Sequence, residues 1–213
     1  MRAIALLLGG FGGLTLLLAL SRWLARRRWA ALGHLALAGA LLAAASTLWP
    51  LAADLASYGR LRPNAPLAQV FAERTGSKSW RLTLTRLPEG RMQVFEVTGE
   101  EWRLDAHVLR WKGRAIAWGA TPAVRLERLS TRFAAASAPG DAPASSYALT
   151  EAAGGDLWER ARGGSRWADY VEAQAAEGEW RRLAPGGRWE VRLEGPRLQS
   201  RPANAAAQSP PAR

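Results

Sequence analysis

Uncharged, mostly apolar residues are concentrated at the start of the chain in two long windows. The first holds 19 uncharged residues between Arg2 and Arg22, and the second holds 25, from Trp29 to Ala53. As an α-helix, 19 residues extend about 29 Å, close to a hydrocarbon core of about 30 Å. The pattern predicts a transmembrane hairpin over residues 1–53, with spans at about 3–21 and 29–51. Pro50 is expected to end or bend the second helix.

Each window has an alternative interpretation. The first resembles the apolar region of a cleavable signal peptide, but its small-residue cleavage pattern is poor, because Leu-Ala-Leu-Ser is followed by Arg22 and a second apolar window. The alternative for the second window is a buried core helix, for which 25 uncharged residues are too many. We therefore favour two membrane spans.

The connection between the two windows predicts the orientation of the hairpin. It reads SRWLARRR and contains Arg22, Arg26, Arg27 and Arg28. Arginine is costly to translocate against the membrane potential, so a short arginine-rich loop stays in the cytoplasm. We expect both ends of the hairpin outside, and residues 54–213 in the periplasm of a bacterium whose inner membrane holds the spans.

Small residues within the windows indicate where helices approach closely. Gly9 and Gly13 form a small-xxx-small pair, which lets two helix backbones pack tightly in lipid. The pair serves either packing of the two spans within one chain or homodimerisation, and we favour the first because the second span is always available. His34 is the only ionisable side chain inside either window. It lies close to the arginine loop, so we expect an interfacial histidine rather than a proton relay.

Beyond a juxtamembrane connector at residues 54–66, apolar and polar residues alternate with the period of β-strands. We expect strands at the alternating stretches Trp80–Arg86, Met92–Val97, Trp102–Leu109, Val124–Phe133, Glu179–Leu183, Arg188–Glu194 and Arg197–Arg201. The inward-facing positions predict one shared core that includes Trp102, Leu104, Val108, Trp189, Val191 and Leu193. Residues 67–201 should therefore form one β-rich domain.

Breaks in this alternation predict loops and helices. Residues 134–146, AAASAPGDAPASS, indicate a flexible exposed loop. Two short helices should follow, the first capped by Asp156 with Glu159 three positions on, the second by Ser165. The Ala-, Pro- and Ser-rich tail at 202–213 is expected to be disordered. The predicted fold is a two-helix transmembrane hairpin followed by a small α+β domain with six or seven short strands and two short helices.

Charge and composition exclude several classes of function. The chain has no cysteine, which excludes disulfides, thiol catalysis and Cys-ligated metals. Its 29 basic and 18 acidic residues give a net charge of +11, but beyond the hairpin the two signs alternate along the strands, which is not the basic stripe of a nucleic-acid-binding protein. Arg60 and Arg62 are better suited to anionic lipid headgroups. The lipid bilayer is thus the first expected partner, and nucleic acid is not one.

Candidate chemistry is sparse. The sequence holds no P-loop, dinucleotide fingerprint, Gly-x-Ser-x-Gly or His-Glu-x-x-His motif, and we expect no cofactor and no metal. Asp105 and His107 are the candidate catalytic residues. They lie two positions apart on one strand and so share a face, and a carboxylate that orients an imidazole is half of a catalytic triad. Arg103 is on the same face, so a solvated polar face is the favoured alternative. Trp111 and Trp118 are candidates for a stacking platform, although core packing is expected for most of the 11 tryptophans.

Four segments carry a resemblance to a known group: Glu101–Gly113, Arg125–Ser130, Gly155–Trp158 and Arg201–Asn204. Together they resemble small proteobacterial membrane proteins with two N-terminal spans, which are commonly labelled "cation/multidrug efflux pump" or "multidrug transporter". The resemblance implies a transport-related role and assigns no site residue. Two spans in one chain cannot enclose a translocation path, and neither window holds an acidic residue. Only an oligomer of hairpins would keep that role open.

These observations lead to one favoured function and two alternatives. We expect a membrane-anchored, non-enzymatic envelope module that binds a protein or the membrane surface, with a homo-oligomer through the spans left open. The first alternative is a subunit of, or accessory to, an efflux or transport system. The second is an envelope enzyme that uses Asp105 and His107. A pocket enclosing those two residues favours the enzyme, whereas an apolar groove or an exposed sheet edge favours binding.

Overall fold

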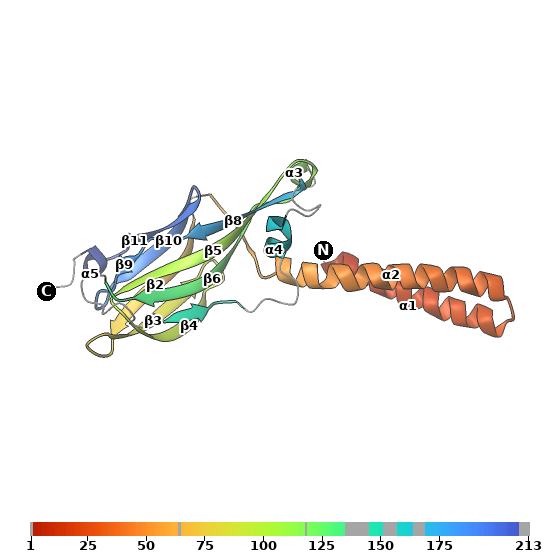
Figure 1. Cartoon of the computed structure of the whole chain (residues 1–213), viewed down its shortest axis with the longest axis horizontal. Coiled ribbons are helices and arrows are strands. Elements are labelled where there is room, and N and C mark those ends of the chain that lie inside the picture. Colours follow the sequence, from red (N-terminus) through yellow and green to blue (C-terminus); the bar gives the residue numbers. More distant parts are fainter. Residues whose placement is uncertain are drawn as a thin grey trace. The chain divides into compact units, whose positions relative to one another are not determined.

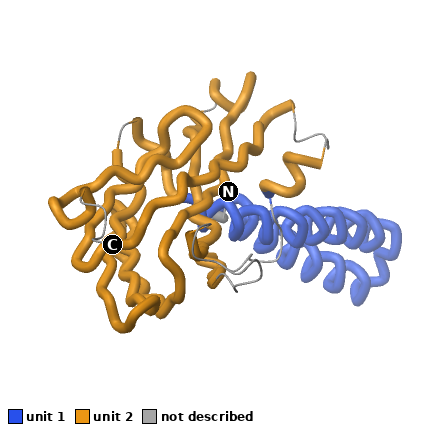
Figure 2. The backbone as a smooth tube through the Cα atoms, turned by 60° about the vertical axis from the view of Figure 1, so that its left-hand side comes forward, with its two compact units in different colours: residues 1–58, 152–157 blue, residues 59–151, 158–213 orange. Residues whose placement is uncertain are grey.

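The computed structural model describes residues 2–63, 65–117, 119–134, 145–150, 157–163 and 169–208. The chain divides into two compact units. The first comprises residues 1–58 with 152–157, and the second comprises residues 59–151 and 158–213 (Figure 2). Each unit is described below by itself.

The first unit contains two long apolar helices joined by a tight turn (Figure 1). Helix α1 covers Arg2–Leu24 and helix α2 covers Arg28–Leu55. Both are long and apolar enough to cross a membrane, as the sequence predicts. Helix α2 continues through Pro50 to Leu55, so the proline does not end it. It lies in the last two turns, where only one backbone hydrogen bond is lost.

Alanine and glycine line the contact between α1 and α2. Ala5, Ala19, Ala31 and Ala38 are buried, whereas most of the large leucines on both helices are exposed. A Cβ atom added at Gly12 would lie 2.9 Å from the Leu42 side chain. Small side chains therefore let the two backbones approach, and the leucines face outward, as in a helix pair solvated by lipid.

The second unit is a sandwich of two antiparallel sheets (Figure 1). Sheet A has the order β1-β6-β5-β8, with β7 beside β6 and β9 beside β5. Its strands are β1 (Gly59–Arg60), β5 (Glu101–Trp111), β6 (Ala123–Arg132), β7 (Ser146–Ala148), β8 (Val171–Glu177) and β9 (Arg181–Arg182). Sheet B has the order β11-β10-β2-β3-β4. Its strands are β2 (Pro66–Arg74), β3 (Ser79–Arg86), β4 (Arg91–Thr98), β10 (Arg188–Glu194) and β11 (Arg197–Pro202).

The two sheets share one hydrophobic core. Trp102 of β5 in sheet A and Trp189 of β10 in sheet B are both buried, and their rings meet edge to face with centroids 5.5 Å apart. The predicted core is confirmed, because Leu104, Val108 and Val191 are buried in the same cluster and Leu193 packs against it. Strict alternation along the strands places these side chains between the sheets.

A β-bulge lies in the middle of β6. Asp105 pairs with Arg128, but the next residue of β5, Ala106, pairs with Leu126, so Glu127 is the extra residue. The bulge changes which side chains point inward: Val124 and Leu126 are buried before it, and Leu129 after it. A bulge shifts the phase of the alternation by one residue, so β6 contributes buried side chains to the core on both sides of the bulge.

Short helices accompany the strands, and one of the two predicted short helices is wrong. Helix α3 covers Arg114–Ala117 and α4 covers Leu157–Arg162, which is the first of the two predicted short helices. Within the first unit, the backbone N–H of Leu157 donates to the Asp54 carboxylate at 2.8 Å. The two predicted caps, Asp156 and Ser165, lie outside the described residues. The second predicted helix is wrong, because residues 171–177 form strand β8 along the edge of β5.

The remaining two predictions concern the loop and the tail. Residues 135–144 of the predicted loop lie outside the described part of the chain. In the predicted disordered tail, Ala205–Gln208 form helix α5. Asn204 holds this turn: its side-chain oxygen accepts the N–H groups of Ala207 and Arg188, and its amide donates to the carbonyl of Gly186 at 2.8 Å. This is helix capping by an Asn side chain.

Candidate functional site

The predicted catalytic residues lie on the outer face of sheet A, where both are half-buried. The side chains of Asp105 and His107 are only 19% and 17% exposed. The face is polar, as expected, but these two side chains are less exposed than those of a fully solvated face. The imidazole of His107 stacks on Trp158 of helix α4, with parallel rings and centroids 3.8 Å apart.

His107 and Asp105 have different partners. His107 Nδ1 lies 3.5 Å from Glu127 Oε2, and the same oxygen lies 3.2 Å from Arg125 Nε, whose side chain is almost fully buried. Asp105 instead pairs with Arg103 at 3.5 Å and accepts the N–H of Gly178 at 3.3 Å. The two residues that share a strand face thus belong to separate clusters and form no His–Asp dyad.

The carboxylate beside His107 was not predicted from the sequence. Glu127 is the bulged residue of β6, and bulges re-aim side chains. Glu127 forms an ion pair with the buried guanidinium of Arg125 and neutralises its charge, and it also faces the imidazole. Within the described ranges, no group of three or more His, Asp or Glu side chains is arranged to hold a metal ion.

Ion pairs and cation–π contacts occupy the neighbouring part of this face. The guanidinium groups of Arg103 and Arg132 lie 4.8 Å and 4.3 Å from the ring centre of Trp180. Arg132 also pairs with Glu101 at 2.7 Å. The charged side chains named on the outer face of sheet A thus have partners inside the chain.

The outer face of sheet B has a different chemistry. Strand pairing places Met92 of β4, Thr85 of β3 and Gln69 of β2 in one cross-strand row, which continues to Glu190 of β10. The neighbouring row holds Val94, Thr83, Phe71 and Arg188. All eight side chains point away from the core, because their neighbours along the strands are the inward-facing ones. We call these two rows the sheet B face.

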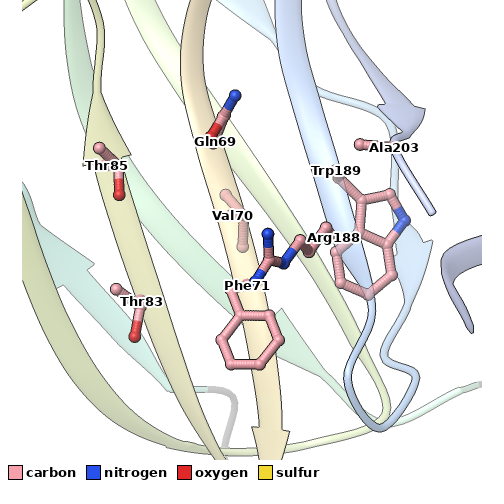
Figure 3. Close-up of a pocket in the computed structure, with 8 residues that line it drawn as sticks. All are labelled: Gln69, Val70, Phe71, Thr83, Thr85, Arg188, Trp189 and Ala203. Carbon is pink, nitrogen blue, oxygen red and sulfur yellow. The ribbon is translucent and has the colours of Figure 1, made fainter. Parts of the chain in front are cut away.

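A hollow of about 360 Å³ lies within the sheet B face (Figure 3). It is lined by Gln69, Val70, Phe71, Thr83, Thr85, Arg188, Trp189 and Ala203. The guanidinium of Arg188 lies 5.3 Å from the ring centre of Phe71. The hollow therefore offers neutral hydrogen-bonding groups, the aromatic side chains of Phe71 and Trp189, and a single cation.

The free edge of the sheet B face is apolar. Met92 and Val94 are 69% and 58% exposed. Their strand, β4, is the last of sheet B and, in the described part of the chain, pairs with β3 alone. Among the described residues, Tyr147 and Ser145 contact the far end of this edge, where the Tyr147 hydroxyl donates to Glu96 O at 2.6 Å and the Thr98 N–H donates to Ser145 Oγ at 3.3 Å. Exposed apolar residues on an edge strand are unusual in soluble domains, which protect such edges with charges.

The sequence analysis missed this face, although β4 carried a signal for it. Both phases of the strand contain apolar residues: Phe95 and Val97 face inward, and Met92 and Val94 face outward. A half-buried strand has only one apolar phase, so the second phase indicates an unpartnered surface. Of the predicted platform, Trp111 donates its indole N–H to Thr121 O at 2.9 Å, and Trp118 lies outside the described residues.

The predicted determinants of the hairpin lie in the first unit. Arg26, Arg27 and Arg28 are exposed at the turn, and Arg22 is half-buried. A Cβ atom at Gly9 would lie 3.9 Å from Ala45 Cβ, while Gly13 has open space around it. Gly9 and Gly12, rather than Gly9 and Gly13, therefore face α2. The ring nitrogen Nδ1 of His34 lies 2.7 Å from Ala30 O on its own helix.

Comparison with known proteins gives no match: no family model, no curated protein and no solved structure is similar to this chain. The resemblance to proteins labelled as multidrug transporters stays a prediction.

Proposed function

We propose that the protein is a membrane-anchored, non-enzymatic module that binds an envelope protein through the sheet B face. The observation that carries the proposal is the combination of exposed Met92 and Val94 on an unpaired edge with the adjoining hollow. An unpaired strand edge offers backbone N–H and C=O groups to an extended partner segment, and apolar side chains beside it add contact area.

The partner we expect is an extended, uncharged segment with apolar side chains. In both rows of the sheet B face, the residues on β4, β3 and β2 are uncharged. The charged residues of the rows, Glu190 and Arg188, lie on β10. Charged residues are depleted at the centre of protein interfaces, as they are here. Sheet A, by contrast, keeps its charges in pairs within the chain, so a partner would gain little there.

The proposed location follows from the hairpin. Helices α1 and α2 are long and apolar enough to span a membrane, and four arginines lie in or beside the turn that joins them. The positive-inside rule keeps that turn in the cytoplasm. We place the sandwich in the periplasm, anchored to the inner membrane.

Site-specific photo-crosslinking in intact cells tests the binding face. A photoreactive amino acid at position 94 should yield a discrete crosslinked protein. The same group at position 116 is the matched control, because Ile116 on α3 is also 59% exposed but lies outside the sheet B face. Crosslinking of the same species from both positions, or of none from position 94, would contradict the proposal.

A pair of charge substitutions makes the test quantitative. For this test the photoreactive group is moved to position 92. Val94→Lys should then reduce recovery of the crosslinked partner by roughly tenfold, because burying an unpaired charge in an interface costs more than about 1.4 kcal/mol. Ile116→Lys should leave recovery unchanged. Equal recovery from the two variants would show that the edge of β4 is not the binding surface.

A further inference from the structure

An apolar groove lies between α1 and α2 near the turn that joins them. It has a volume of about 360 Å³ and is lined by Leu16, Leu17, Ala19, Leu20, Trp23, Ala31 and Leu35. Its lining contains no charged side chain. The small side chains of Ala19 and Ala31, both buried in the helix contact, leave the space that the leucines and Trp23 surround.

The turn ties the arginines directly to the end of this groove. The backbone N–H of Arg26 donates to the carbonyl of Trp23 at 3.0 Å, and that of Ala31 donates to the carbonyl of Arg27 at 3.0 Å. Trp23 and Ala31 line the groove from its two helices. The cationic turn and the apolar groove therefore adjoin each other along the chain.

We propose that the turn end of the hairpin binds a phospholipid with an anionic headgroup. One acyl chain occupies the groove, and the phosphate is held by guanidinium groups of Arg22, Arg26, Arg27 and Arg28. An acyl chain matches a lining of leucine, alanine and tryptophan, and arginine is the side chain best suited to phosphate. Basic sites between helices at the cytoplasmic face bind anionic lipids by this combination.

Charge favours a lipid over a second copy of the hairpin in the groove. Two copies in one membrane share the same orientation, so their arginine turns lie at the same depth. Pairing through this groove would bring two clusters of four cations together without an anion between them, which is repulsive. An anionic headgroup removes that repulsion, so the lipid is the occupant that complements both parts of the site.

Native mass spectrometry of the full chain, released from detergent with added lipid, tests the proposal. The probes are phosphatidylglycerol and phosphatidylcholine with identical acyl chains. We expect phosphatidylglycerol adducts to survive at activation energies that remove phosphatidylcholine. Arg27→Gln/Arg28→Gln should abolish this difference. The control Arg128→Gln/Arg197→Gln, which removes the same charge from exposed positions on β6 and β11 of the sandwich, should retain it.

A second pair of variants tests the groove itself. Leu17→Trp should fill it and reduce phosphatidylglycerol retention at least fivefold. Leu7→Trp is the matched control, because Leu7 is equally exposed on α1, 60% against 64%, but does not line the groove.

Equal retention of the two lipids, or retention unaffected by the arginine or Leu17 variants, would overturn the proposal, as would a lipid-free dimer. The proposal rests on membrane insertion of the hairpin. Extraction of membranes with alkaline carbonate tests insertion separately: release of the chain would refute the anchor, whereas a retained chain without lipid selectivity would refute the lipid site alone.

Discussion

At the scale of single residues, the contact between Trp102 and Trp189 is the clearest link between the two sheets of the sandwich. Trp189→Ala should lower the free energy of unfolding by about 3–5 kcal/mol, because it removes a large buried ring and its edge-to-face contact with Trp102. His107→Ala should cost about 1–2 kcal/mol, since His107 is partly exposed and stacks on Trp158. Urea unfolding of the full chain in detergent, followed by near-ultraviolet circular dichroism, measures both. A larger loss from the histidine variant would contradict the assignment of the core face.

The fold leaves no room for a side chain at Gly178. A Cβ atom there would overlap the backbone carbonyl oxygen of Leu104, and backbone cannot move as a side-chain tip can. Gly178 also forms the bridge to Leu198 that connects the two sheets. Gly178→Ala should therefore destabilise the sandwich by about 1–3 kcal/mol.

Gly59→Ala is the control, because a Cβ atom at this strand glycine would meet only ordinary contact at 3.7 Å. Thermal unfolding of both variants beside the wild-type chain checks the prediction. Similar melting temperatures for the two variants would show that β5 and the segment after β8 do not approach as closely as in the structure.

At the scale of elements, the sequence predicted the strands that alternate clearly and failed where local signals conflict with long-range pairing. Strands β3, β4, β5, β6, β10 and β11 lie where alternation places them. Strand β8 is rich in alanine, which favours a helix locally, but it pairs along β5 and buries Val171 and Ala176. Strand β2 covers Pro66–Arg74, where no strand was predicted, and it is nonetheless the central strand of sheet B. Pairing with distant strands decides such cases.

The candidate site was harder to predict than the strands, for a related reason. The sheet B face exists because β10, from the end of the chain, pairs with β2 and brings Arg188 opposite Phe71. No local pattern specifies that pairing. The prediction correctly placed Asp105 and His107 on one face of a strand, but the carboxylate that lies beside His107 is that of Glu127, which the bulge in the neighbouring strand β6 positions there. Strand order and bulges are thus the information that periodicity lacks.

The packing of α1 against α2 gives an element-scale prediction. The Cβ atoms at positions 9 and 45 would lie 3.9 Å apart, within the range for a disulfide. Gly9→Cys/Ala45→Cys should therefore form an intrachain bond under mild oxidation, in a chain that has no other cysteine. Adding Gly12→Leu should reduce the yield severalfold, because the leucine would collide with Leu42.

Gly13→Leu is the matched control for this experiment, since position 13 has open space and the disulfide yield should stay high. Thiol labelling and gel mobility of the oxidised chain give the yields. Disulfides between two chains, in place of the intrachain bond, would favour homodimerisation through α1, which is the alternative role of the small residues in this helix.

At the scale of the whole molecule, the sequence separates two kinds of surface. Residues 1–53 hold five arginines and no acidic residue, while all 18 acidic residues follow from Asp54 onward. The large exposed side chains of the helices are leucines, whereas the sandwich exposes mixed charges with a local apolar face. Lipid suits the first surface and water suits the second. A membrane hairpin joined to one domain outside the bilayer is the arrangement that gives each surface its own solvent.

The orientation of that arrangement is the last prediction. Alkaline phosphatase fused after residue 208 should be active and green fluorescent protein at the same position dark, because the arginine turn holds the connection between the helices in the cytoplasm. Fusions after residue 28, which end at the turn, should behave in the opposite way. Replacing Arg22, Arg26, Arg27 and Arg28 by glutamine leaves Arg60 and Arg62 as the nearest cations beyond α2. The charge bias then reverses, so the residue 208 fusions should lose phosphatase activity and gain fluorescence in a large fraction of the chains. A wild-type fusion that is fluorescent and phosphatase-inactive would place the sandwich in the cytoplasm and remove the proposed envelope partner.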